Sequence, residues 1–365
     1  MGTISISIKE EEKKYPIFIG NETLKELSSF LNMNHPNKRI AVITDDTVNR
    51  LHRDKIADSL SNPLLVLVPA GEASKSRKRK EEIEDNLLEN NFGRDSIIIA
   101  IGGGVIGDLA GFAAATFNRG IPIIHVPTTL LAMVDSSIGG KASVNTHHGK
   151  NLIGAFHHPD AVFADLRFLE TLPEDEFKSG LAEIIKMAVA LDKDLFDFLE
   201  KNRNKILARD KDILLHIIKG SIELKRDIVE KDPKESGLRQ LLNFGHTFGH
   251  ALELLNQYKL KHGVAIAQGI TVEVKISALK RQLSANDEER VTALLRNFGL
   301  PANVDGNINP EKLIELMATD KKSINHNPRF VMLEKIGKCK SENGKFSFEV
   351  DHKTISNAIE LCKND

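Results

Sequence analysis

Four short runs of apolar, largely β-branched residues in the first half of the chain most constrain how it can fold. They lie at 40–43, 64–68, 97–101 and 121–126, and stretches with helical spacing of apolar residues separate them. Uninterrupted apolar runs of this length predict strands that are buried on both faces, and their alternation with helices predicts a mostly parallel sheet. We therefore expect an α/β domain at the N-terminus.

The pattern changes after Leu166, because apolar residues then recur at helical spacing and nearly every segment from 173 to 300 is typical of a helix. A chain of 365 residues is also long enough to form two domains. Thr171 can cap the first of these helices, and Pro173 lies near its first turn. We therefore expect an α/β domain over residues 1–171 and an all-α domain over residues 172–365.

Charge and cysteine content exclude several classes of partner. The 50 Lys and Arg residues against 51 Asp and Glu residues give a net charge of -1, so no overall attraction to nucleic acid or to an anionic membrane is expected. Residues 9–14 are charged where a secretory signal would be apolar, and no uncharged apolar stretch is long enough to span a bilayer. Cys339 and Cys362 do not form a CxxC pair, which argues against a disulfide framework and a thiolate zinc site. We expect a cytoplasmic protein.

A glycine-rich loop follows the strand predicted at 96–101. Its sequence, GGGVIGD from Gly102 to Asp108, contains the pattern GxGxxG and leads into a predicted helix. Glycines here let the backbone approach a pyrophosphate, and the helix N-terminus offers free N–H groups. The loop follows a third or later strand, and no acidic residue ends the next strand, so a dinucleotide must be held differently from one in a Rossmann fold. Segments 44–46 and 71–75 follow other strands and could contribute to the same site.

Two histidines on one predicted helix are candidate metal ligands. His246 and His250 are four residues apart in NFGHTFGHA, which places both on one face of a helix. Alone, this spacing is more typical of an ordinary helix face, but His262 and Glu183 change the balance. Glu183 lies in an otherwise apolar helical stretch, where an unpaired carboxylate is costly unless it binds a cation. Three N and O ligands are typical of a catalytic zinc site, although the spacing leaves open which two histidines bind.

Two segments before the predicted domain boundary combine glycines with lysines. The segments 135–145 and 149–154 place glycines next to lysines, so backbone and ammonium groups can converge on a phosphate. Each further cation is, taken singly, more typical of a surface charge. These further cations are Arg119, Lys225 and Arg239.

Taken together, these segments resemble the 3-dehydroquinate synthase family. The resemblance runs from about Asp45 to Lys322, and its most specific strings are GGGVIGDLAGFAAATFNRG, VPTTLLAMVDSSIGGKASVN, GKNLIGAF and LLNFGHTFGHALE. It implies an NAD-binding α/β domain, a helical metal-binding domain, an active site in the cleft between them and a homodimer.

The resemblance also implies roles for individual residues. The metal ligands, which suit zinc or cobalt, are Glu183, His246 and His262. The catalytic residues are His250 and Glu235, which transfer protons, with Lys141, Asn151 and Arg239. The substrate positions are Asp135, Lys141, Asn151, Lys186, Lys225, Arg239, Asn243, His250, Lys321 (or its neighbour Lys322) and Arg119, which would reach a neighbouring subunit's site. The NAD positions are Asp45, Glu72, Lys75, Gly103, Gly104, Asp108, Thr128, Thr129 and Lys150, with Phe168 and Thr171 close by.

The family's reaction converts 3-deoxy-D-arabino-heptulosonate 7-phosphate to 3-dehydroquinate and phosphate. NAD oxidises the C5 hydroxyl, which acidifies the C6 proton so that phosphate can leave, and the hydride then returns to C5. The metal acts as a Lewis acid on the C4 and C5 hydroxyls. By this resemblance the phosphate would be held by Lys141, Asn151, Asn243 and His250. The carboxylate would be held by Arg239 and Lys225.

Three other functions fit parts of the pattern. A cyclase of sedoheptulose phosphate should lack several of the carboxylate and phosphate partners, which are all present here, whereas a cyclase of an amino-substituted substrate stays open. A metal-dependent polyol dehydrogenase would have little need for Lys141, Lys150 and Arg239. A catalytically silent NAD-binding or scaffold protein should have lost a ligand or a cation, and none is missing. The sequence therefore favours the synthase.

Overall fold

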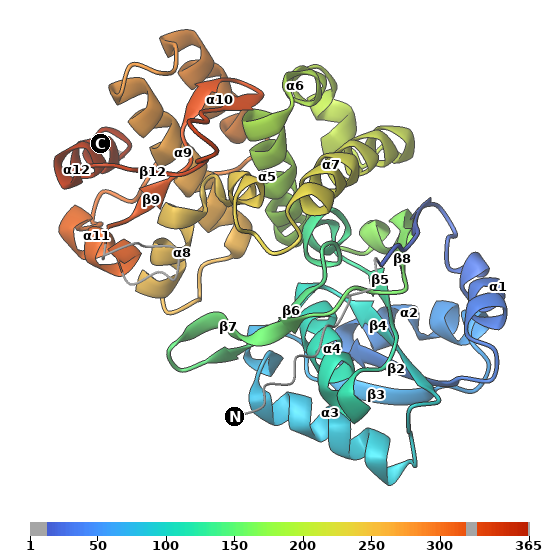
Figure 1. Ribbon diagram of the computed structural model, residues 1–365. Coiled ribbons are helices and arrows are strands. Elements are labelled where there is room, and N and C mark those ends of the chain that lie inside the picture. Colours follow the sequence, from blue (N-terminus) through green and yellow to red (C-terminus); the bar gives the residue numbers. More distant parts are fainter. Residues whose placement is uncertain (1–12, 319–326, 364–365) are drawn as a thin grey trace, which may run out of the picture.

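One six-stranded parallel sheet forms the first half of the protein (Figure 1). The computed structural model describes residues 13–318 and 327–363. The strands, in the spatial order β1-β8-β5-β4-β2-β3, are β1 (Ile17–Gly20), β2 (Arg39–Asp45), β3 (Leu64–Val68), β4 (Ser96–Gly102), β5 (Ile123–Pro127) and β8 (Ala161–Asp165). The four predicted strands are confirmed as β2 to β5. The sequence pattern did not predict β1 and β8, which are short.

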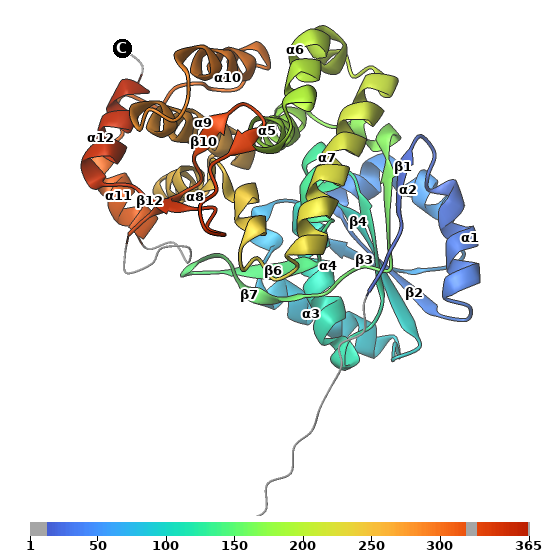
Figure 2. The ribbon, with the colours of Figure 1, turned by 45° about the horizontal axis from the view of Figure 1, so that its top comes forward.

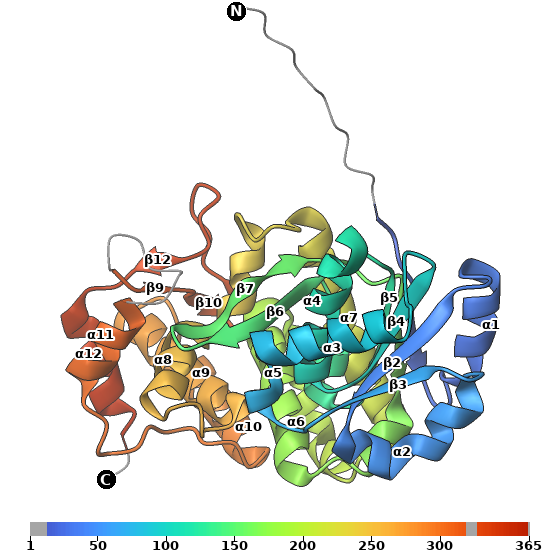
Figure 3. The ribbon, with the colours of Figure 1, turned by 90° about the horizontal axis from the view of Figure 1, so that it is seen from below.

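Alternate residues of the central strands face opposite sides of the sheet, and helices cover both sides. Val42 and Ile99 pack on one side with α1 (Lys25–Asn34) and α2 (Asp46–Ser59). Ala41 and Ile98 pack on the other side with α3 (Arg77–Glu89) and α4 (Gly104–Thr116). Figure 3 shows α2 and α3 on opposite sides of β2 and β3. Burial on both faces explains why these strands are apolar without interruption.

The order of the strands reverses beside β2. This strand pairs with β3 on one side and with β4 on the other, so the connections leave in opposite directions. A crevice therefore opens at the C-terminal ends of β2 and β4, where open α/β sheets bind ligands. Asp45 ends β2 at this point, and Gly103 precedes α4 directly after β4.

A hairpin projects from the α/β half toward the helical half (Figures 1 and 2). It consists of β6 (Lys141–Thr146) and β7 (Gly149–Phe156), which pair with each other in antiparallel register outside the main sheet. Asn145 N donates to Lys75 O at 2.8 Å, which anchors the hairpin beside the segment that follows β3. The sequence predicted an anion-binding segment here without predicting its strands.

Helices make up most of the second half. They are α5 (Glu174–Leu191), α6 (Lys193–Leu207), α7 (Lys211–Lys231), α8 (His246–Leu255), α9 (His262–Leu279), α10 (Ala285–Asn297), α11 (Pro310–Ala318) and α12 (His352–Leu361). Two short antiparallel pairs, which the helical pattern did not predict, are β10 (Leu333–Lys335) with β11 (Lys338–Cys339) and β9 (Arg329–Phe330) with β12 (Phe348–Glu349). Within 13–318 and 327–363, no helix combines the length and apolar character that crossing a membrane requires.

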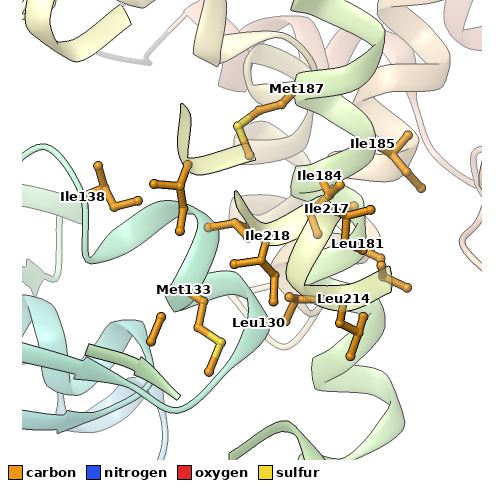
Figure 4. Close-up of a cluster of buried hydrophobic side chains, with 14 of the residues drawn as sticks. Leu130, Met133, Ile138, Leu181, Ile184, Ile185, Met187, Leu214, Ile217 and Ile218 are labelled. Atoms are coloured by element: carbon orange, nitrogen blue, oxygen red, sulfur yellow. The ribbon is translucent and has the colours of Figure 1, made fainter. Parts of the chain in front are cut away.

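A buried apolar cluster joins the two halves (Figure 4). Leu130 and Met133, which follow β5, pack against Leu181 of α5 and Ile218 of α7. The approach is close, because a Cβ on Gly180 of α5 would lie 2.6 Å from Leu130 Cβ. The cluster therefore fixes the position of α5 relative to the sheet. The predicted division between residues 171 and 172 falls just before α5 and stays a prediction.

Candidate active site

A cleft of about 1010 Å³ lies between the C-terminal ends of the strands and the helical half. Most of the residues that the sequence analysis singled out line it. Those on the α/β side are Asp45, Glu72, Lys75, Gly103, Gly104, Asp108, Thr128, Thr129, Asp135, Lys141, Lys150, Asn151, Phe168 and Thr171. Those on the helical side are Lys186, Lys225, Glu235, Arg239, Asn243, His246, His250 and His262.

Three side chains form a compact cluster on the helical side. Glu183 belongs to α5, and His246 and His262 are the first residues of α8 and α9. Each offers a ligand atom that lies within 4.8 Å of the other two. Nε2 of His246 is 3.5 Å and Nε2 of His262 is 3.3 Å from Oε1 of Glu183. Two nitrogens and one oxygen are the ligand set of a catalytic zinc site.

Glu183 is fully buried, and a second charge accompanies it. Lys186, one turn later on α5, is 2% exposed, and its Nζ lies 2.6 Å from Oε2 of Glu183. The same Nζ donates to Leu242 O at 2.7 Å. The sequence indicated an isolated carboxylate among apolar residues, whereas an ion pair with the residue at i+3 partly balances its charge. Lys186 faces Oε2 of Glu183, whereas both histidine rings face Oε1, so Oε1 is the oxygen that lies between the two candidate nitrogen ligands.

The charges around His262 favour a cation at this point. Burial opposes protonation of the ring, but the neighbouring carboxylates of Glu183 and Glu253 raise the pKa of His262 to about 9. Burial also opposes ionisation of Glu183, yet Lys186 and His262 keep its pKa below the usual range. A proton and a divalent ion therefore compete for one position. The donor set fits zinc or cobalt.

His250 lies beside this cluster as a separate group. It is one turn after His246 on α8, and its ring centroid lies 5.2 Å from that of His246 and 6.4 Å from that of His262. The structure therefore brings together Glu183, His246 and His262, the three residues that the sequence resemblance implied as ligands. It places His250 at the cleft wall next to them.

Several residues on the α/β side that the resemblance predicts to bind NAD form a polar network. Lys75 Nζ pairs with Asp108 and donates to Oδ1 of Asn151. Ser143 Oγ donates to the same Oδ1 at 3.0 Å. Burial raises the pKa of Asp108, although Lys75 opposes this shift. The first turn of α4, which begins at Gly104, adds unpaired backbone N–H groups, which attract an anion such as a pyrophosphate.

The hairpin is tied to both walls of the cleft. Asn145 Nδ2 donates to Glu72 Oε1 at 2.7 Å on the α/β side. Lys150 Nζ lies 3.9 Å from Oε1 of Glu72 and 3.0 Å from Oε1 of Glu253 on α8. The ammonium also lies 4.6 Å from the ring centroid of Tyr258. Lys150 therefore spans the two halves.

The end of the cleft next to α2 is apolar with a few polar groups. The Phe168 ring packs edge-on against the ring of His52, with centroids 4.8 Å apart. His52 Nε2 hydrogen-bonds with Thr171 Oγ1 at 2.8 Å, and that hydroxyl donates to Phe168 O at 3.3 Å. Asp45 caps α2 by accepting from Val48 N at 2.8 Å. Phe168, His52, Thr171 and Asp45 all line this end of the cleft.

Arg239 is a buried cation that the backbone holds in place. It is 2% exposed, and Nη1 donates to Pro233 O at 2.6 Å and Nη2 to Gly139 O at 3.3 Å. Gly139 has a φ of 90°, and a Cβ there would lie 2.5 Å from Nη2, so this position requires glycine. Asp232 accepts hydrogen bonds from three backbone N–H groups of the segment 236–239, which fixes the start of that turn.

Lys225 is buried and pairs with Asp135, whose side chain is 31% exposed. Lys225 Nζ donates to Oδ1 of Asp135 at 2.7 Å and to its carbonyl oxygen at 2.5 Å. Asp135 lies in η3 (Ala132–Ser136), a turn of π-helix, which is a conformation frequently found at functional sites. Burial lowers the pKa of Lys225, although Asp135 opposes this shift. Burial opposes ionisation of Asp135, but Lys225 and Lys186 hold its pKa well below the usual range.

Glu235 connects the hairpin to the helical half. It pairs with Lys141 of β6 and accepts from Asn243 Nδ2 at 2.7 Å. Its φ of 60° places it in the left-handed region, which an ordinary residue adopts at a cost. A carboxylate held between an ammonium and an amide at the cleft wall can take part in proton transfer.

Arg119 lies away from this cleft, the predicted position at Lys321 or Lys322 falls outside the described residues, and sequence reasoning missed other residues. Arg119 is an exposed residue of η2 (Phe117–Arg119), outside the described lining of this cleft. Lys321 falls outside the described residues. Glu253, Asp232 and His52 were missed. Glu253 ends the string LLNFGHTFGHALE, and its place seven residues after His246 on one helix could have indicated it.

Comparisons with known proteins show the family and the fold of this chain. Residues 65–179 match the family model for the 3-dehydroquinate synthase N-terminal region, and residues 180–323 match that for its C-terminal region. A 3-dehydroquinate synthase of Thermodesulfovibrio yellowstonii is 43% identical over 95% of this chain and 97% of its own. The crystal structure of 2-deoxy-scyllo-inosose synthase with carbaglucose-6-phosphate, NAD+ and Co2+ has a TM-score of 0.87 at 28% identity, covering 95% of this chain and 96% of that one. A probable glycerol dehydrogenase of Sinorhizobium meliloti, at a TM-score of 0.66 and 17% identity over 95% and 96% of the two chains, shares the fold.

Proposed function

The chain belongs to the 3-dehydroquinate synthase family, and we propose that the residues of its cleft divide the work of that reaction as follows. The enzyme converts 3-deoxy-D-arabino-heptulosonate 7-phosphate to 3-dehydroquinate and phosphate, with NAD and a zinc or cobalt ion as cofactors. The observation that carries the assignment is that one cleft joins the metal cluster of Glu183, His246 and His262 to a row of buried cations. A doubly anionic substrate needs both.

The cations fix the two ends of the substrate. Arg239 and Lys225 are 2% and 5% exposed, so they suit a carboxylate that leaves water on binding. Lys141 and Asn151 on the hairpin, with Asn243 and His250 on the helical side, hold the phosphate. Charged contacts at both ends keep the reacting carbons in one orientation.

Glu235 and His250 transfer protons during the reaction. Both line the cleft, but Glu235 pairs with Lys141 of the hairpin whereas His250 lies beside His246 of the metal cluster, so they can reach different positions on the substrate. Bound NAD supplies a hydride acceptor that is regenerated, and the bound metal supplies a Lewis acid. Glu183, His246 and His262 hold the metal. The polar groups around Asp45, Lys75 and Lys150 hold NAD; the other NAD positions are Glu72, Gly103, Gly104, Asp108, Thr128, Thr129, Phe168 and Thr171.

The same cations argue against the alternative functions. A polyol has no carboxylate or phosphate, so a polyol dehydrogenase would have no use for two buried cations at its substrate site. Asp135 neutralises Lys225, but Arg239 is held by backbone carbonyls, and its positive charge still needs an anionic partner. A cyclase acting on sedoheptulose 7-phosphate would leave the same two cations facing a hydroxymethyl group. The buried pair is therefore best explained by a keto acid substrate.

We further propose that the protein is a cytoplasmic homodimer with a domain boundary between residues 171 and 172. Both described cysteines, Cys339 and Cys362, are free and buried, which fits a reducing compartment. Arg119 is exposed and lies away from its own cleft, so it is available to a neighbouring subunit's substrate. Light scattering during gel filtration measures the dimer.

The direct test is phosphate release from the heptulosonate phosphate by the purified protein. We expect turnover with NAD and zinc, and loss of turnover in Glu183→Gln. Glu174→Gln is the matched control, because Glu174 is an exposed residue at the start of the same helix and pairs with Lys178. Absence of phosphate release from the parent protein with both cofactors would exclude the proposed reaction.

A further inference from the structure

Glu253 occupies a position between the metal cluster and the hairpin. It lies on α8, is 2% exposed and uses its two oxygens in different directions. Oε2 is 3.6 Å from Nδ1 of His262, and Oε1 is 3.0 Å from Nζ of Lys150 on β7. A buried carboxylate with one oxygen toward a metal ligand and one toward a cofactor position can act on both sites.

On the metal side, Glu253 orients the His262 ring. Nε2 of His262 lies 3.3 Å from Glu183, so Nδ1 is the nitrogen that Glu253 faces. At 3.6 Å this contact is electrostatic and longer than a hydrogen bond. A carboxylate on this side favours the proton on Nδ1, leaves the lone pair of Nε2 to the metal and makes that nitrogen a stronger donor. His246 has a weaker equivalent, because its Nδ1 lies 3.1 Å from Phe244 O, a neutral carbonyl.

On the cofactor side, Lys150 stands between two carboxylates. Its Nζ is 3.0 Å from Glu253 on the helical side and 3.9 Å from Glu72 on the α/β side. A long, flexible ammonium in this position can shift toward whichever side gains negative charge. The diphosphate of NAD adds two negative charges to the α/β side of the cleft, where Lys75 and the first turn of α4 also lie.

We propose that Glu253 is a positioning residue that couples NAD binding to metal binding. When the diphosphate attracts Lys150, less positive charge neutralises Glu253, and its carboxylate acts more strongly on His262. NAD binding then tightens metal binding, and by linkage the metal tightens NAD binding by the same factor. The inference rests on the proposed metal and NAD sites.

The test is the zinc dissociation constant, measured by competition with a chromophoric chelator at fixed pH, with and without saturating NAD. For the parent protein we expect NAD to tighten zinc binding by about fivefold or more. For Glu253→Gln we expect zinc binding to weaken by about 10- to 100-fold, and the effect of NAD to fall below about twofold. The visible spectrum of bound Co2+ should also change, since it reports the ligand geometry.

Two further variants separate charge, folding and coupling. Glu176→Gln is the matched control, because Glu176 pairs at 2.8 Å with Lys261, the neighbour of His262, and it should keep the parent's zinc affinity. Lys150→Gln leaves Glu253 facing His262, so it should bind zinc at least as tightly as the parent without NAD and lose the response to NAD. The Lys150→Gln variant tests the coupling even if the Glu253→Gln protein does not fold, which a melting curve without a cooperative transition would show.

Each outcome has one meaning. Unchanged zinc affinity in a folded Glu253→Gln protein overturns the positioning role. The coupling is overturned if NAD leaves the zinc affinity of the parent protein unchanged. It is also overturned if NAD tightens zinc binding in Lys150→Gln as much as in the parent protein. A parent protein that binds neither zinc nor NAD contradicts the proposed function, which distinguishes that failure from failure of this inference.

Discussion

Replacing Arg239 should remove the preference of the enzyme for a carboxylate-bearing substrate. The side chain is 2% exposed, and Pro233 O and Gly139 O hold its guanidinium before substrate arrives, so little ordering remains to oppose binding. Two hydrogen bonds from a guanidinium to a carboxylate contribute about 1.5 kcal/mol each at the low end of the measured range. Their combined loss of about 3 kcal/mol lowers kcat/KM by roughly 150-fold.

The assay compares two substrates and two variants. With the heptulosonate phosphate, Arg239→Met should show the fall of roughly 150-fold in phosphate release, whereas with sedoheptulose 7-phosphate the change should stay within about threefold. Where the sugar turns over too slowly, its inhibition constant replaces kcat/KM. Arg226→Met is the control, because Arg226 is an exposed residue of α7 that pairs with Asp227.

The outcome that would refute the reasoning is an equal loss for both substrates. Arg239 would then support the turn at Gly139 without contacting the carboxylate. Equal turnover of the two substrates by the parent protein would remove the argument for a keto acid substrate altogether. A measurable loss in Arg226→Met would show that the assay reports stability instead of recognition.

Three other predictions concern the metal, the cofactor and pH. Chelation of the metal should abolish turnover, and zinc or cobalt should restore it. Metal analysis should find that His262→Ala loses the ion, whereas His250→Ala retains the ion and turns over more slowly. Equal loss of metal in the two variants would contradict the assignment. NAD should be needed in catalytic amount, with no NADH accumulating at about 340 nm, because the hydride returns to the substrate; stoichiometric NADH would favour a dehydrogenase. Burial opposes ionisation of Asp232, but backbone hydrogen bonds from the segment 236–239 lower its pKa to about 2 from an ordinary 3.8. The folded pKa is the lower one, so this stabilisation is present above about pH 4 and is lost toward pH 2. In urea unfolding of the metal-free protein, Asp232→Asn should therefore lower the free energy of unfolding at neutral pH and reduce its decrease toward acid pH. If the free energies of unfolding of parent and variant ran parallel from about pH 7 to about pH 2, this prediction would be wrong.

The central strands and the glycine loop could be predicted because their signals are local. Residues 97–101 are apolar without interruption and GxGxxG follows at once, so both the strand and its turn are specified within a dozen residues. β1 was missed because its four residues are only partly buried and pair with β8, far along the chain. Short strands whose partners are distant have little pattern of their own.

The candidate metal ligands could be predicted from the sequence, whereas the residues around them could not. HxxxH and a glutamate in an apolar helix are visible in one dimension, although spacing alone did not separate His250 from the ligands. The ion pair of Lys150 with Glu253 joins residues 103 positions apart in sequence. No local periodicity reports such a contact, and it becomes visible when the hairpin is placed against α8.

The apolar cluster between the sheet and the helical half has a consequence for protein production. A fragment that begins at residue 172 would expose the side chains of α5 and α7 that now pack against Leu130 and Met133. Each fully buried leucine or isoleucine contributes about 1.5–3 kcal/mol by leaving water. Expressed alone, the helical half would expose these side chains as a contiguous apolar patch and would aggregate. The two halves are thus distinct in architecture but have to be expressed as one polypeptide.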